Sequence, residues 1–259
     1  MGIESLGFLI IYIGVFLGGA GTIFYLGFRN IRLARIVKET PTSQVVDVRK
    51  GFVELKGKVE AILGRYLHSP VRKVPCVYYN TKVQRYISSG KGGHWQTVWK
   101  REKGVKFLLN DGSGKISIEP MKARMVVKKK QMSTTGIFSS PPAHLLEFLR
   151  KEGIDHRTLF GTLRRFRYIE KYLPLKQEIY VLGTAVDVPL DPELERDLEV
   201  IPFTISSISG RVPFVITDST ERDLLLTFIL KGIGWFILSI MVLGVGYFLL
   251  TRPFAGLFL

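Results

Sequence analysis

The part of this sequence that most looks like a chemical site is the glycine-rich segment SSGKGG at residues 88–93. Glycines expose backbone N–H groups that suit a phosphate, and Lys91 lies among them. A P-loop, however, needs a longer glycine spacing, a Lys-Ser/Thr pair and a following helix, whereas Trp95 and Trp99 follow in a strand-like segment. The segment therefore favours a hairpin connection over a nucleotide site.

Few residues are available for metal binding or nucleophilic catalysis. The single cysteine, Cys76, excludes a disulfide framework and lies in the alternating pattern of a strand. No metal-ligand spacing relates the four histidines, which are His68, His94, His144 and His156. No local signature marks a Ser-His-Asp triad either. We therefore predict no metal and no other cofactor.

Basic side chains offer a third kind of chemistry, the binding of anions. The clusters Lys128-Lys129-Lys130 and Arg164-Arg165-Arg167 have aromatic residues nearby, which is the combination that OB-type nucleic-acid binders use. Successive strand residues point to opposite faces, however, so the lysine run cannot form one surface. A solvated face, or a membrane or acidic protein partner, therefore outranks nucleic acid. The candidate contacts for anionic lipid or a partner are Arg29, Arg32, Arg35, Lys38, Lys128, Lys130, Arg164 and Arg165.

Two uncharged segments bracket these basic residues. The mean hydropathy is +0.19 although 23% of the residues are charged, so the apolar residues must be concentrated. Residues 6–28 and residues 232–251 contain no charged side chain, and each segment is long enough to cross a hydrocarbon layer of about 30 Å. Only Glu4 is charged before the first segment, which argues against a cleaved signal peptide. The sequence predicts two transmembrane helices.

The distribution of Lys and Arg predicts the orientation. Four basic residues follow the first span within residues 29–41, a basic juxtamembrane segment that we expect to remain helical until Pro41. Arg222 and Lys231 precede the second span, and Arg252 is the only basic residue that does not lie between the two spans. By the positive-inside rule the central domain faces the cytoplasm and both termini lie outside. Anionic lipid would attract the juxtamembrane segment by about 1 kcal/mol per basic residue, unless these cations merely fix the topology.

Glycines in the spans suggest helix packing. Gly14 and Gly18 are four residues apart and share one helix face, where another helix backbone could approach closely. We name this pair as the candidate for helix association, either within the chain or between chains.

Residues 42–219 have the pattern of a mainly β domain. Val53, Leu55 and Val59 alternate with charged residues, which is the two-residue period of a strand with one wet face. Residues 76–86 alternate similarly, and the turn-forming segment NDGSG at 110–114 predicts a hairpin. Further strands are expected at residues 95–101, 124–129, 166–173, 178–186, 203–206 and 212–216.

One helix interrupts these strands. Ser140 is a candidate N-cap, and Gly153 can end the helix in a left-handed conformation. In the strand that follows, Glu170 shares a face with Phe166 and Tyr168, so we expect it to form a structural ion pair. The fold class is a membrane protein in which two transmembrane helices flank a mainly β (α+β) domain, either a barrel or a sandwich.

Several segments together resemble the GIDE domain, also called the BAM or "beside a membrane" domain. This family is known from membrane-anchored RING-type E3 ubiquitin ligases of mitochondria and chloroplasts and from bacterial and archaeal relatives. The resemblance covers residues 42–219 and includes the two flanking spans. It is carried by VELKGKVE (53–60), SP (69–70), PCVYY (75–79), FLLNDGSG (107–114) and YVLG (180–183).

The resemblance implies a fold and a location more than an activity. In this family the ligase activity resides in a C-terminal RING with eight Cys/His zinc ligands, and residues 252–259 contain none. The eukaryotic members place the domain in an intermembrane space, whereas the charge distribution of this chain favours the cytoplasm. We therefore predict a non-catalytic partner-binding or assembly module at the membrane surface, with a protein partner or a second copy as its ligand. The alternatives are a membrane-bound hydrolase or nucleotide-dependent enzyme with a site assembled at long range, and an OB-type nucleic-acid binder.

Overall fold

The computed structural model describes residues 3–90, 92–128, 130–133, 142–155, 164–187, 199–206 and 213–251. The chain forms two compact units, a helical unit made of its two ends and a β unit, Pro41–Ser219. The order of elements confirms the predicted fold class, in which two long apolar helices flank a mainly β domain.

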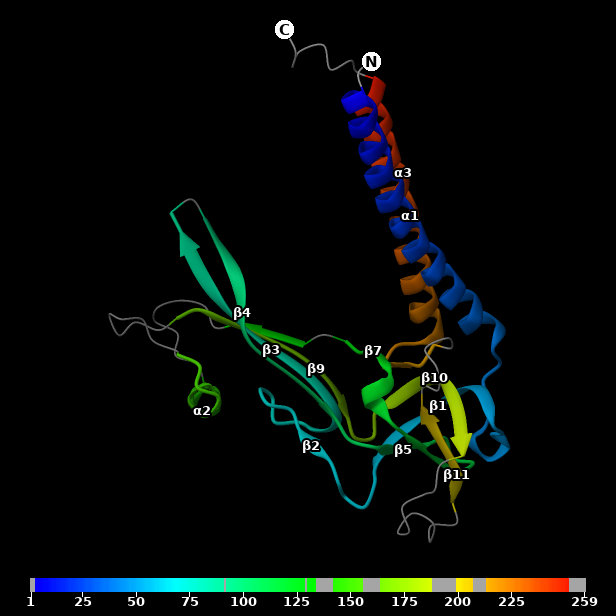
Figure 1. Ribbon diagram of the computed structural model, residues 1–259. Coiled ribbons are helices and arrows are strands. Elements are labelled where there is room, and N and C mark those ends of the chain that lie inside the picture. Colours follow the sequence, from blue (N-terminus) through cyan, green and yellow to red (C-terminus); the bar gives the residue numbers. More distant parts are fainter. Residues whose placement is uncertain are drawn as a thin grey trace. The chain divides into compact units, whose positions relative to one another are not determined.

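The helical unit consists of α1 (Ile3–Glu39) and α3 (Glu221–Thr251), which pack side by side and antiparallel (Figure 1). The Tyr12 hydroxyl donates to the Gly246 carbonyl at 3.1 Å, and the Ser239 hydroxyl donates to the Ala20 carbonyl at 3.1 Å. Both helices are long and apolar enough to cross a membrane. Helix α1 does not end with its uncharged segment but continues through the basic residues to Glu39.

Glycines allow the two helices to approach closely, although not at the positions that the sequence suggests. A methyl group added at Gly27 would lie 2.8 Å from the Phe236 ring, and one at Gly232 would lie 2.6 Å from Ile31. An added methyl group at Gly14 or Gly18 would meet nothing within 4 Å. The α1–α3 contact therefore does not use the Gly14/Gly18 pair, and packing of this pair against another chain stays a prediction.

Five strands of the β unit close into a barrel. They are β1 (Gly51–Ala61), β5 (Phe107–Asn110), β6 (Lys115–Ile118), β10 (Glu178–Asp187) and β11 (Val200–Ser206). Around the ring, β1 pairs with β5, β5 with β6, β6 with β11, β11 with β10, and β10 with β1. Of these five pairs, only β6–β11 is parallel. Strands β12 (Val215–Thr217) and β7 (Arg124–Val126) extend this sheet from β10.

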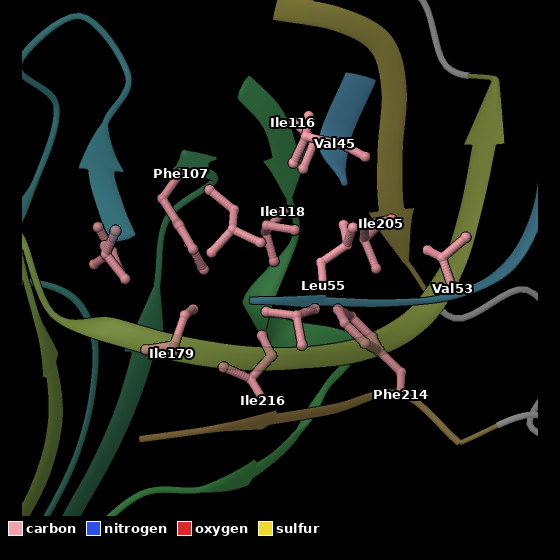
Figure 2. Close-up of a cluster of buried hydrophobic side chains, with 14 of the residues drawn as sticks. Val45, Val53, Leu55, Phe107, Ile116, Ile118, Ile179, Ile205, Phe214 and Ile216 are labelled. Carbon is pink, nitrogen blue, oxygen red and sulfur yellow. The ribbon is translucent and has the colours of Figure 1, made fainter. Parts of the chain in front are cut away.

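The barrel interior is an apolar core, which Figure 2 shows in close-up. Leu55, Phe107, Ile116 and Ile205 come from four different strands and are fully buried in it. The alternation in β1 explains this placement, because Lys56 and Lys58 face outward between buried residues. Burying this apolar surface supplies most of the stability that the barrel needs.

The loop between β5 and β6 fastens the segment that enters the barrel. The carboxylate of Asp111 accepts a hydrogen bond from the Val45 backbone N–H at 2.7 Å with one oxygen. With the other oxygen it accepts hydrogen bonds from Ser113 and from the Gly114 N–H. Val45 lies in the 3-10 turn η1 (Val45–Asp47) and is buried in the barrel core. The predicted hairpin turn therefore also holds η1 against the barrel. We call these hydrogen bonds of the Asp111 carboxylate the Asp111 clamp.

The second sheet lies beside the barrel and contains β2 (Leu67–His68), β3 (Pro75–Ser89), β4 (Gly92–Gly104), β8 (Lys130–Ser133) and β9 (Phe166–Pro174). Strand β3 pairs with β9 and, at its other edge, with β2 and β4. Strands β3 and β4 form a long hairpin that projects as a ribbon in Figure 1. The glycine-rich segment is the turn of this hairpin, as Ser89 pairs with Gly92.

In the described part of the β unit, one short helix, α2 (Ala143–Lys151), packs on this sheet. It begins after Pro142 rather than at Ser140, which lies outside the described residues. Gly153 has a φ of 67°, the left-handed conformation expected at the end of the helix.

Candidate functional site

The second sheet has two faces with different chemistry, and its register assigns each residue to one of them. Residues directly opposite on paired strands share a face, as do alternate residues of one strand. One face bears Val83 and, opposite it, Tyr168 and Trp99. Together with Leu145 and Phe148 of α2, these residues form an apolar cluster. We call this face the α2 face and the other the open face.

Four cross-strand rows make up the open face, each with one residue from β4, one from β3 and one from β9 or the segment just before it. From the barrel end to the hairpin tip, the rows are Glu102, Asn80 and Lys171; Lys100, Lys82 and Ile169; Thr97, Gln84 and Arg167; and Trp95, Tyr86 and Arg165. These twelve residues include five cations and one carboxylate. All twelve are half-buried or exposed, so the face is accessible.

A β-bulge in β4 separates the two tryptophans of that strand. Val83 is opposite Trp99 and Gln84 is opposite Thr97, so Val98 is the extra residue. Without the bulge, residues 95 and 99 would share a face. With it, Trp99 packs at 5.1 Å against Phe148 on the α2 face, while Trp95 joins the open face.

At the hairpin end of the open face, guanidinium groups lie over aromatic rings. The Arg165 guanidinium is 4.8 Å from the centre of the Tyr86 ring, and that of Arg167 is 4.6 Å from the Trp95 ring. The two rings meet edge to face at 5.3 Å. Arg167 also donates two hydrogen bonds to the Gln84 side-chain oxygen, at 2.9 and 2.6 Å. These contacts hold two cations in fixed positions without neutralising them.

Nearer the barrel the cations are lysines. Lys82 and Lys100 are directly opposite each other, a like-charge arrangement that is unfavourable between strands. Among the residues that the structure describes, no ion pair involves Lys82, Lys100 or Lys171. The one carboxylate of the face, Glu102, accepts a hydrogen bond of 2.5 Å from the Tyr78 hydroxyl. The open face therefore has a strong positive charge excess.

The α2 face, by contrast, uses its polar groups internally. Arg101 donates two hydrogen bonds to the Glu152 carboxylate, at 2.9 and 2.8 Å, and its guanidinium lies 5.1 Å from the centre of the Trp99 ring. The Trp99 indole N–H donates to the same carboxylate at 3.0 Å. This network fastens the end of α2 to β4, beside the apolar cluster that α2 covers.

Glu170 is buried on the α2 face, and among the side chains that the structure describes it forms no ion pair; Lys130, which lies opposite it on β8, is outside that set. Its carboxylate accepts hydrogen bonds from the Val71 N–H at 3.0 Å, the Arg72 N–H at 3.2 Å and the Thr81 hydroxyl at 3.0 Å. Backbone donors of the loop between β2 and β3 thus hold this carboxylate in place, and the ion pair stays a prediction. Burial, and secondarily the negative charge of Glu170, raises the pKa of Cys76 to about 12, which leaves the thiol unreactive.

Strand β4 offers a second feature, an edge. Of the described strands, only β3 pairs with β4, so one side of a 13-residue strand has no strand partner there. The half near the barrel carries Lys100, Arg101 and Lys103, charges that discourage edge pairing. The half near the hairpin turn, residues 92–97, carries no Lys, Arg, Asp or Glu. This half can accept another strand.

The structure brings only part of the predicted basic set to this site. Arg165 lies on the open face, whereas Arg164 turns away and pairs with Asp155 at 3.0 Å. Lys128 is exposed and its backbone N–H donates to Asp218, while the side chain of Lys130 lies outside the described residues. The α1 set is exposed in the helical unit and consists of Arg29, Arg32, Arg35 and Lys38.

The outer face of strands β5 and β6 does not have the composition of a nucleic-acid surface. On β5 and β6, the residues that point outward include Leu108 and Ser117, which are both buried. Lys115 forms a 2.7 Å ion pair with Glu199. The combination of aromatic rings and cations is therefore found on the second sheet, not on the barrel strands that an OB-type binder uses.

Comparison with known proteins gives one match. The family model GIDE, described as E3 ubiquitin ligase, matches residues 78–250. No curated protein and no solved structure matches the chain. In the described part of the chain, no three His, Cys, Asp or Glu side chains are grouped as a metal site.

Proposed function

This chain belongs to the GIDE family, and from that premise we propose that it is a membrane-anchored, non-catalytic binding module that recruits a protein partner at the membrane surface. Helices α1 and α3 are the anchor in this proposal, and the β unit faces the cytoplasm with both termini outside. Two observations support the anchor: the length and apolar composition of both helices, and the basic residues that follow the first span.

The observation that carries the recruiting role is the edge of β4. Backbone N–H and C=O groups along an unpaired edge form a template to which an extended peptide can add as a further strand. The uncharged half at residues 92–97 contains His94 and Trp95, side chains that can provide specificity on either face of the added strand. We propose that an extended segment of the partner protein pairs with this half.

Two residues, Cys76 and Glu170, support the proposal that the module is not catalytic. Cys76 is buried with a raised pKa, and Glu170 is buried and accepts three hydrogen bonds from backbone and hydroxyl donors. Neither residue has the exposure that a nucleophile or a general base needs. Recruitment through a strand edge requires no reactive group.

The test is site-specific photo-crosslinking of the full-length protein in its native membrane. A photoreactive amino acid at His94 should give a discrete protein adduct, and one at Lys58 should give none, because β1 is paired on both sides. Gln96→Pro should reduce the His94 adduct at least about fivefold, since proline blocks edge pairing. The matched Gln96→Ala variant should retain it.

Three outcomes would contradict the proposal. Equal adducts at His94 and Lys58 would indicate non-specific contact, and an adduct that survives Gln96→Pro in a correctly folded protein would exclude strand addition. Release of the protein from membranes by alkaline carbonate would disprove the anchor. An adduct with twice the mass of the chain would identify a second copy as the partner.

A further inference from the structure

We propose that the open face of the second sheet is a docking surface for anionic phospholipid headgroups, in the same bilayer that holds α1 and α3. The inference rests on the membrane anchor of the proposed function but not on the β4 edge. It concerns the face of the sheet and not its edge, because side chains stand on the faces of a sheet and an added strand pairs along its edge; Trp95 and Thr97 belong to both.

The charge of the face requires an anionic partner. Lys82, Lys100, Lys171, Arg165 and Arg167 all project from the same three-stranded surface. Glu102, the single acid among them, is at the end of the face and bound to Tyr78. The direct opposition of Lys82 and Lys100 is unfavourable in the isolated protein, and a phosphate between them would remove the repulsion.

The aromatic geometry favours a headgroup layer over a nucleic acid. Single-stranded nucleic acids bind sheets by stacking bases on the faces of aromatic rings. On this face, Arg165 already lies over Tyr86 and Arg167 over Trp95, and the two rings contact each other edge to face. Both rings therefore have one face covered. Trp and Tyr side chains with adjacent Arg are, in contrast, the residues that anchor proteins at the membrane–water interface.

Chain connectivity favours the bilayer as the source of the phosphates. Helix α1 ends at Glu39 and the β unit begins at Pro41, while the β unit ends at Ser219 and α3 begins at Glu221. With connectors this short, headgroups are held near the domain at a high effective concentration. The cytoplasmic leaflet is also the leaflet with the more negative surface potential.

The test follows the distance of the face from the headgroups in the full-length protein. Thr97 is exposed on the open face, in the edge strand β4, and Thr97→Cys can be labelled with a fluorophore because the only native cysteine is fully buried. The labelled protein is reconstituted into phosphatidylcholine vesicles with or without phosphatidylglycerol, and both contain a headgroup-linked quencher. We expect quenching to increase at least about fivefold with the anionic lipid and to fall at high salt.

Matched variants separate docking from general electrostatics. A label at Lys58→Cys on the barrel should respond equally in both vesicles. The triple variant Lys82→Gln, Lys100→Gln, Lys171→Gln should abolish the lipid-dependent quenching at residue 97. The triple variant Lys56→Gln, Lys58→Gln, Lys103→Gln removes the same charge from exposed positions elsewhere and should retain it.

Two results would overturn the inference. Equal quenching at residue 97 in both kinds of vesicle would do so, provided that the protein stays in the vesicles after a carbonate wash. A change of signal caused by a single-stranded oligonucleotide, with no effect of lipid composition, would assign the face to nucleic acid instead. Loss of the protein in the carbonate wash would disprove the anchor, and therefore the proposed function as well, so the failures can be told apart.

Discussion

In the barrel, each of the five strands is paired on both sides, whereas in the second sheet β4 is paired by β3 alone among the described strands. The barrel also buries its inner face in an apolar core. The second sheet covers one face with α2 and leaves the other charged and accessible. The β unit thus contains one sheet closed into a barrel and one sheet with an accessible edge and an accessible face.

The difference separates stability from recognition. A closed barrel has no edge to aggregate, and its interior supplies the burial that stabilises the fold. The second sheet can then keep features that are unfavourable for an isolated domain, namely an uncharged edge and two facing lysines. Substitutions in the barrel should therefore change stability, and substitutions on the open sheet should change binding.

The largest effect is expected from Leu55→Ala in β1. Leu55 is fully buried in the barrel core, and truncation of such a side chain leaves a cavity that costs about 3 kcal/mol. Urea unfolding of the full-length protein in detergent measures the loss. The control is Ile169→Ala on the open face, where a half-buried side chain should cost less than about 1 kcal/mol. Equal losses would show that the open face is part of the core.

The second-largest loss of stability is expected when the Asp111 clamp is removed. Burial raises the pKa of Asp111, but hydrogen bonds from the Val45 N–H, from Ser113 and from the Gly114 N–H lower it by more. Asp111→Asn should cost about 1–3 kcal/mol at neutral pH, because both carboxylate oxygens accept hydrogen bonds and an amide nitrogen cannot accept any. The unfolding free energy measures this loss.

The pH dependence of the clamp follows from the direction of that pKa shift. The folded pKa of Asp111 lies below its unfolded value of about 3.9, so the stabilisation is present above that value. It disappears as the pH falls through the lower, folded pKa. Asp111→Asn should lack this part of the acid transition, and an unchanged acid profile in the variant would contradict the role of the clamp.

Local patterns predicted the closed region better than the open one. The alternation around Leu55 and the turn at residues 110–114 are properties of short segments, and both are found in the structure as expected. The alternation failed at Glu54, which is buried and accepts a hydrogen bond from the Thr42 hydroxyl. A contact with a residue twelve positions away decides that burial, and no period within the strand reveals it.

The open face was less predictable because it depends on register. Residues 76–86 were expected to form an amphipathic strand, but the residues opposite Gln84 and Tyr86 follow only from the pairing of β3 with β4 and β9. The bulge at Val98 then puts Trp95 and Trp99 on opposite faces, although they are four residues apart in one strand. The split of Arg164 from Arg165 reflects where β9 begins, at Phe166, which composition does not specify.

The smallest effect on stability is also the one that distinguishes the two regions most sharply. Lys82→Thr removes the repulsion with Lys100 and introduces a residue that favours strands, so it should stabilise the protein by about 0.2–1 kcal/mol. The matched Lys58→Thr in the barrel removes a lysine that is opposite Glu178, so it should gain less or lose stability. Unfolding in zwitterionic detergent measures both changes.

Lipid binding should respond to the same two variants in the opposite sense: the variant that stabilises the protein should bind anionic lipid more weakly. Lys82→Thr should weaken the lipid-dependent quenching at residue 97, by about fivefold for one cation near an anionic surface, and Lys58→Thr should leave it unchanged. A residue whose removal improves the fold and impairs binding is retained for recognition rather than for packing. If Lys82→Thr instead destabilises the protein, Lys82 contributes to the fold, and the contrast between the closed barrel and the open sheet does not extend to this position.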